Sequence, residues 1–194
     1  MDGVRHEGHV IVSASPTLPS ELRMGSVIPV LRRRKGKYYD AAGNLVKDGI
    51  LHRGRVLHDS KNNITLAGRV RFGELACGLS GDFPDRIAVG DGGLESGTSA
   101  PKIPRDDDLT LEHEVSRIVV AQRILNEDEI PSMTWVALFK TAGSYQFAQL
   151  GQTQISECGL FCRDDVMTNN HNFAPIPVDV HRIGVMIEWE VVIL

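Results

Sequence analysis

The sequence predicts a mainly β protein of the α+β type. We expect an antiparallel β-sandwich or barrel-like domain with one amphipathic helix and an irregular N-terminal arm. Five or six β-prone segments follow one another about ten residues apart in the second half of the chain. Apolar residues recur at helical spacing in one stretch, near residues 64–79. Residues 1–55 are less regular and are interrupted by proline and glycine.

The N-terminal region is expected to be an extended arm that contains a hairpin. Residues 9–12 are a short apolar run, and residues 27–31 contain an internal proline, which is typical of an edge strand. Asp40 and the Gly43-Asn44 pair form a turn signal between two β-prone ends, which predicts a hairpin over residues 38–46. We therefore divide the chain into residues 1–55, an assembly contact, and residues 56–194, a β-rich structural domain.

The second region is expected to begin with the helix and continue as strands. Leu66, Val70 and Leu75 lie at close to helical spacing, with Asn62 or Asn63 as the capping residue and Gly78 near the end. The final segment, residues 185–194, alternates most clearly between two faces. Further strands are expected over residues 50–57, 87–89, 115–125, 133–139, 145–148, 155–163 and 166–173.

Composition restricts the class of protein. The chain has 194 residues, of which 42% are hydrophobic and 24% charged, the proportions of an ordinary globular domain. A net charge of −4 argues against nucleic acid as the main partner. We find no stretch apolar enough to span a bilayer and no signal peptide, so we expect folding in a cytosol. Three cysteines do not suggest a disulfide framework, and we expect small buried thiols.

Several segments resemble chemical motifs but lack essential parts. Gly90-Asp91-Gly92-Gly93 has no Walker lysine or hydroxyl, so a tight turn explains it better than a phosphate loop. The acidic run 106–108 lacks calcium-loop spacing, and His6 with His9 lacks a third zinc ligand. No Gly-x-Ser-x-Gly elbow is present, and Glu188 with Glu190 fits a solvent-facing strand. We assign no catalytic, cofactor-binding or metal-binding residue.

One strongly basic run is a candidate contact surface. It comprises Arg32, Arg33, Arg34 and Lys35, with Tyr38 and Tyr39 beside it. Such a run can bind nucleic acid or an acidic protein surface, or can be a solvated hairpin edge. Because the chain is negatively charged and carries acidic stretches at 106–114 and 127–129, we favour a protein contact or a solvated edge.

Several short motifs occur in a fixed order along residues 56–194. Their order resembles that of tail, collar, baseplate and fibre-attachment structural proteins of tailed bacteriophages: an Asn-rich start to a Gly-Arg helix, an Ala-Val-Gly-x-Gly turn, a Leu-x-x-Glu-x-x-Arg segment, a Glu-x-Gly-Leu-Phe strand and a Trp-containing strand. In this chain those places are held by Gly68 and Arg69, Gly90 and Gly92, Glu114 and Arg117, Glu157 with Gly159, Leu160 and Phe161, and Trp189.

The resemblance implies a non-enzymatic virion protein that is made in the host cytoplasm. Such a protein would assemble as a homo-oligomer at the neck, tail or baseplate and connect other virion components or fibres, without a cofactor, a membrane or nucleic acid. Two alternatives stay open. A capsid decoration or carbohydrate-binding module would use exposed rings such as Tyr38, Tyr39 and Tyr145. A small hydrolase would bring Glu188, Glu190 or a His/Cys pair together in one pocket.

Overall fold

A computed structural model describes residues 8–15, 30–47, 50–51, 53–79, 81–127, 130–139, 154–178 and 184–192. The described chain is mainly β, with twelve strands and one helix, and this confirms the predicted fold class. The chain divides into two compact units. Unit 1 combines residues 1–61, 119–139 and 185–194, and unit 2 combines residues 62–118 and 140–184.

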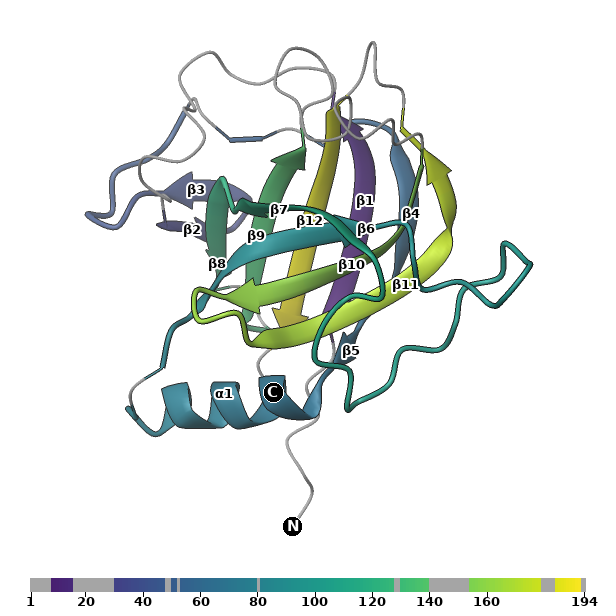
Figure 1. Cartoon of the computed structure of the whole chain (residues 1–194). Coiled ribbons are helices and arrows are strands. Elements are labelled where there is room, and N and C mark those ends of the chain that lie inside the picture. Colours follow the sequence, from purple (N-terminus) through teal and green to yellow (C-terminus); the bar gives the residue numbers. More distant parts are fainter. Residues whose placement is uncertain are drawn as a thin grey trace. The chain divides into compact units, whose positions relative to one another are not determined.

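The described strands of unit 1 form one seven-stranded sheet (Figure 1) in the order β3-β2-β8-β9-β12-β1-β4. Most neighbours are antiparallel, but β2 pairs with β8 in parallel. Strands β9 and β12 are in continuous register, so that Trp135 lies opposite Trp189. The strands are β1 (Gly8–Ser15), β2 (Val30–Arg34), β3 (Lys37–Tyr39), β4 (Val56–Lys61), β8 (Gln122–Asn126), β9 (Ser132–Phe139) and β12 (Gly184–Val192).

Unit 2 contains a five-stranded sheet in the order β5-β11-β10-β6-β7, together with helix α1 (Figure 1). Strand β10 is central and pairs antiparallel with both β6 and β11. A long segment, residues 91–113, connects β6 to β7. The elements are β5 (Asn63–Ile64), α1 (Leu66–Ala76), β6 (Pro84–Gly90), β7 (Glu114–Val119), β10 (Gln154–Cys162) and β11 (Met167–Pro177).

Each unit has its own apolar packing. In unit 1, the buried side chains Leu51, Ala121, Val136, Leu138 and Met186 form a cluster, with Ile124 packed against it. In unit 2, the cluster is Ala88, Leu111, Phe161 and Met167. Strands β9, β10 and β12 supply four of these nine buried residues: Val136, Leu138, Phe161 and Met186.

A helix is present where the sequence predicts one, but its expected apolar face is largely exposed: Leu66 is 59% and Val70 56% exposed, and the buried residue of α1 is Gly68. Its cap also differs from the prediction. Thr65 is the N-cap, and its hydroxyl oxygen accepts a hydrogen bond from the backbone N–H of Gly68 at 2.9 Å. A threonine in extended conformation satisfies a free N–H at the helix start, whereas Asn63 is already part of β5. The helix ends before Gly78, whose φ of 69° is favourable for glycine.

Two strand boundaries differ from the prediction. The apolar stretch 115–125, expected to be one strand, forms β7 in one sheet and β8 in the other. Periodicity alone does not register such a change of sheet, because both halves are β-prone. The further strand expected over residues 50–57 is displaced, since β4 begins at Val56. The segment 145–148 lies outside the described residues.

The predicted 38–46 hairpin is present as a short turn. The carboxylate of Asp40 accepts hydrogen bonds from the backbone N–H groups of Ala42 and Asn44 and from the Asn44 amide. These bonds hold the pKa of Asp40 below its ordinary value. Residues 1–55 were expected to be a separate arm. Their described parts include β1, β2 and β3 of the seven-stranded sheet.

Candidate functional site

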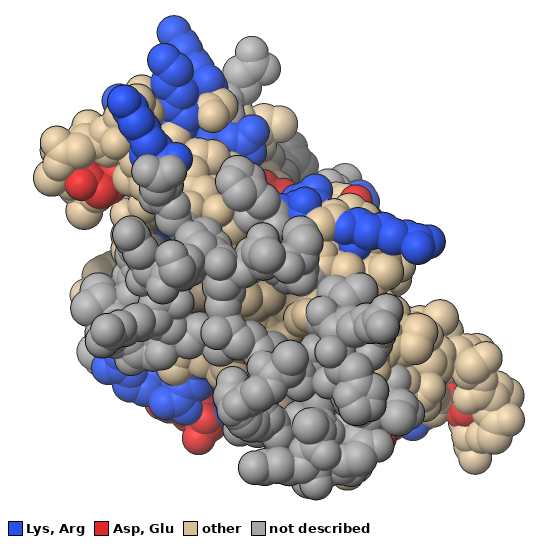
Figure 2. Space-filling model, turned by 90° about the horizontal axis from the view of Figure 1, so that it is seen from above, with Lys and Arg blue, Asp and Glu red and all other residues tan. Residues whose placement is uncertain are grey.

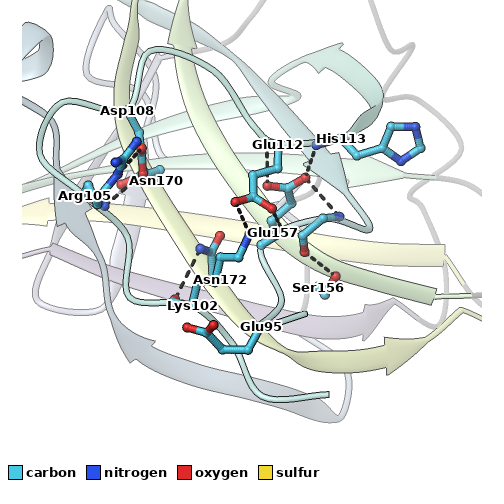
Figure 3. Close-up of polar contacts among 12 residues, drawn as sticks. Glu95, Lys102, Arg105, Asp108, Glu112, His113, Ser156, Glu157, Asn170 and Asn172 are labelled. Atoms are coloured by element: carbon cyan, nitrogen blue, oxygen red, sulfur yellow. Dashed lines mark hydrogen bonds and ion pairs between the residues drawn. The ribbon is translucent and has the colours of Figure 1, made fainter. Parts of the chain in front are cut away.

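The connecting segment 91–113 and strand β11 enclose the larger cavity described in unit 2, with a volume of about 940 Å³. Polar and charged groups dominate its wall, and Figure 3 shows most of them converging from the segment and from β10 and β11. Acidic residues outnumber basic ones. The charged and amide residues of the wall are Glu95, Lys102, Arg105, Asp107, Asp108, Glu112, Glu157, Asn170 and Asn172.

Glu157 on β10 is the buried residue at the centre of this region, with 1% of its surface exposed. One carboxylate oxygen accepts hydrogen bonds from the backbone N–H groups of Gly92 at 3.1 Å and His113 at 2.8 Å. The other accepts from the N–H of Glu112 at 3.0 Å. The carboxylate therefore ties both ends of the connecting segment to the central strand.

Two opposing effects act on the pKa of Glu157. Burial raises it, because a charged carboxylate loses hydration, and the three backbone hydrogen bonds lower it. Burial is the larger effect, so the pKa of Glu157 lies above its ordinary value. Its role follows from the contacts: the carboxylate oxygens are occupied by main-chain donors.

The glycines of the 90–93 turn make this arrangement possible. Gly90 is the register partner of Glu157 across β6 and β10. A Cβ atom at Gly90 would lie 2.4 Å from the Glu157 carboxylate, and one at Gly92 would lie 2.6 Å from it. Gly93 has a φ of 69°. The expected positive φ is therefore found at Gly93, whereas Gly90 and Gly92 are required for a steric reason.

Ion pairs and amides hold the rest of the cavity wall. The Lys102 ammonium lies 2.5 Å from a Glu112 carboxylate oxygen, and this bond lowers the pKa of Glu112. The Asp108 carboxylate accepts from the Arg105 backbone N–H and from the Asn170 amide, each at 2.9 Å. Figure 3 shows these as two adjoining groups of contacts. Asp107 and Asp108 of the acidic run are thus part of the wall.

At the surface beside Glu157, His113 pairs with Asp91. The side chain of His113 is 71% exposed. The hydrogen bond and the charge of Asp91 raise the pKa of His113 above its ordinary value. The pair links the two ends of the connecting segment a second time, outside the buried carboxylate.

Other motif residues also make structural contacts in unit 2. The Arg117 guanidinium lies 3.8 Å from the centre of the Phe161 ring and bonds to Glu114 at 2.6 Å and to Asp165 at 2.7 Å. A Cβ at Gly159 would lie 2.8 Å from the Phe161 ring. These residues join β7 to β10.

The remaining predicted motif residues are more widely placed. Gly68 packs helix α1 against the backbone of Thr168, and Arg69 pairs with Asp106 at 2.6 Å on the surface. Leu160 is buried on β10. Trp189 is fully buried in unit 1, whereas the other motif residues belong to unit 2.

The predicted basic run forms the β2–β3 hairpin of unit 1. Lys35 and Gly36 occupy the turn with φ of 49° and 75°, as a tight two-residue hairpin requires. Arg33 stacks over Tyr38, with its guanidinium carbon 5.9 Å from the ring centre. Arg32 and Arg34 both pair with Glu127.

The carboxylates proposed for the hydrolase alternative have separate partners. Glu188 binds Arg53 through two hydrogen bonds of 2.6 and 2.9 Å, and Glu190 accepts from the Ser132 hydroxyl at 2.6 Å. Cys158 and Cys162 are buried, as expected from their residue type. Burial raises both thiol pKa values, that of Cys162 to about 12. Cys77 is exposed, contrary to the expectation of three buried thiols, because it follows the last turn of α1.

Sequence reasoning did not identify the cavity wall as a unit. It assigns no role to Lys102, Asn170 or Asn172, and it treats Glu112 only as part of the acidic stretch 106–114. The spacing of Asn170 and Asn172 was the available signal, since residues two apart on a strand share a face. Their approach to Lys102 depends on the course of the connecting segment, which local patterns do not specify.

Comparisons with known proteins add no family assignment: the chain matches no protein-family model, no curated protein and no solved structure. Within the described ranges, no group of three or more His, Cys, Asp or Glu residues is arranged to hold a metal ion. Among those same residues, none of the helical structure is long and apolar enough to cross a membrane.

Proposed function

We propose that this chain is a non-enzymatic structural protein of a tailed-phage virion. It assembles as an oligomer at the neck, tail or baseplate and connects neighbouring components or fibres. The proposal rests on two points. The order of the motifs resembles that of tail-associated proteins, and several motif residues make structural contacts in unit 2.

The observation that carries the proposal is the position of Glu157. Its two carboxylate oxygens receive three backbone hydrogen bonds, and Gly90 and Gly92 leave no space between the turn and the carboxylate. A carboxylate held in this way fixes the path of a long segment. This supports a structural role for Glu157, in a scaffold that presents the segment to a neighbouring protein. It does not favour Glu157 as a group that exchanges protons with a substrate.

The two alternatives receive less support. Tyr38 and Tyr39 are consecutive on β3, so their rings leave opposite faces and do not form one stacking platform. Tyr145 lies outside the described residues. Neither of the two cavities described in unit 2 has a histidine or cysteine in its wall.

Mass spectrometry of purified virions of the encoding phage tests the proposal. We expect the chain to be present in fixed proportion to the major tail proteins and to remain after density-gradient purification. Its absence from such particles would contradict the proposal. Light scattering of the purified chain tests oligomerisation separately. A structural protein that forms rings should have a molar mass in solution above that of the monomer.

A further inference from the structure

The β2–β3 hairpin of unit 1 is a strongly charged projection. Arg32, Arg33, Arg34, Lys35 and Lys37 are all exposed, and Glu127 pairs with Arg32 and Arg34. Figure 2 shows several Lys and Arg side chains standing out close together on this face of the molecule. A tight turn and the Arg33–Tyr38 stack limit the number of hairpin conformations, which lowers the entropy lost on docking.

The cavity of unit 2 has the opposite charge. Its wall carries five carboxylates and two cations. Four of the carboxylates have partners in unit 2: Asp107, Asp108, Glu112 and Glu157. Glu95 and Asp107 are exposed at the wall. The Asp107 side chain is 75% accessible and lies 3.6 Å from the Arg105 guanidinium, an exposed ion pair of the kind that contributes little. Glu95 and Asp107 are therefore the carboxylates best placed to meet an incoming cation.

We propose that the basic β2–β3 hairpin of one copy docks against the acidic cavity of a second copy. The carrying argument is charge complementarity: arginines and lysines on a firm projection meet carboxylates around a cavity of about 940 Å³. This inference rests on the proposed role in assembly. It identifies the hairpin and the cavity as the two surfaces that form the contact between copies.

The hairpin and the cavity are different surfaces of the same chain. Contact between them is therefore heterologous, and repetition of such a contact gives a closed ring or an open filament. Either product suits a component that is repeated around or along a phage tail. A two-fold dimer, by contrast, would need the same surface on both copies.

Charge reversal on each side tests the contact. One variant carries Arg33→Glu and Lys37→Glu, and another carries Glu95→Lys and Asp107→Lys. We expect each pair alone to weaken self-association roughly tenfold or more, because like charges then face each other. A 1:1 mixture should regain wild-type assembly, since the reversed hairpin complements the reversed cavity.

Matched controls use exposed charges outside both surfaces. Arg55→Glu and Asp82→Lys change the net charge in the same directions at exposed positions. Sedimentation velocity at low and high salt measures assembly, and circular dichroism checks that each variant is folded. Wild-type association should weaken with salt, because the screening length falls from about 10 Å at 0.1 M to about 3 Å at 1 M.

Three outcomes would overturn the inference. Assembly that survives both reversals would place the contact elsewhere, while the proposed structural function, tested by virion composition, would stand. Equal loss in the control variants would show a general charge effect. A wild-type chain that stays monomeric at low salt and instead binds an oligonucleotide through the hairpin would make nucleic acid the partner.

Discussion

The carboxylate of Glu157 accepts a hydrogen bond from the backbone N–H of Gly92 at 3.1 Å, in a place where Gly92 has no room for a side chain. The same carboxylate binds Glu112 and His113 through their N–H groups. One side chain of the central strand thus fixes a connecting segment of more than twenty residues. Removal of its acceptor oxygens should affect the whole segment.

Glu157→Gln is expected to destabilise the chain by about 1–3 kcal/mol. The glutamine has the same shape, but its amide NH₂ replaces one acceptor oxygen and leaves a buried N–H without a partner. Chemical denaturation measures the free energy of unfolding. Glu74→Gln, on α1 with 37% of the Glu74 side chain exposed, is a control that should change stability little, since exposed ion pairs contribute little. Equal stability of the two variants would contradict the anchoring role.

The same substitution predicts a pH dependence. The pKa of Glu157 is raised in the folded state, so its contribution to stability is fully present below its ordinary pKa and is lost as pH rises through the raised value. The difference in unfolding free energy between wild type and Glu157→Gln should therefore shrink from pH 4 towards pH 7. Denaturation midpoints at several pH values measure it, and a difference that grows with pH would refute the assignment.

Two glycines of helix α1 should respond oppositely to alanine. At Gly68 a Cβ would lie 2.0 Å from the carbonyl oxygen of Thr168, so Gly68→Ala should cost about 1–3 kcal/mol by separating the helix from β11. At Gly73 a Cβ meets nothing within 4 Å, and alanine is the better helix former, so Gly73→Ala should stabilise by about 0.5–1 kcal/mol. Thermal unfolding of both variants shows whether Gly68→Ala lowers the stability and Gly73→Ala raises it.

The contrast between these glycines shows what the sequence can predict. The position of the helix followed from residue spacing, and the positive φ of Gly93 followed from residue type, because both depend on neighbours in the chain. The requirement for Gly68 depends on Thr168, a hundred residues away. The cavity wall depends in the same way on contacts of the connecting segment with β11, such as that of Asp108 with Asn170. Such long-range contacts leave no local periodic signal.

The Asp91–His113 pair predicts a shifted titration. Because Asp91 stabilises the protonated imidazole, His113 should titrate above its ordinary pKa of 6.5. Proton NMR of the imidazole C–H signals measures the midpoint. Asp91→Asn should move it down towards that ordinary value. The pair adds stability below pH 6.5 that is lost as pH rises through the shifted pKa, and an unchanged midpoint in the variant would contradict the pairing.

The three thiols should differ sharply in reactivity. Thiolate is the reactive form, and a thiol with a pKa of about 12, such as Cys162, is ionised in roughly one molecule in ten thousand at pH 8. Cys158 is fully buried and also has a raised pKa. A disulfide reagent should therefore modify one thiol quickly in the folded chain, and the Cys77→Ser variant should lose that fast phase. Denaturant should then expose the other two together, because both lie on β10 and depend on the same packing. Rapid modification of all three thiols in the folded chain would mean that β10 is not buried as described.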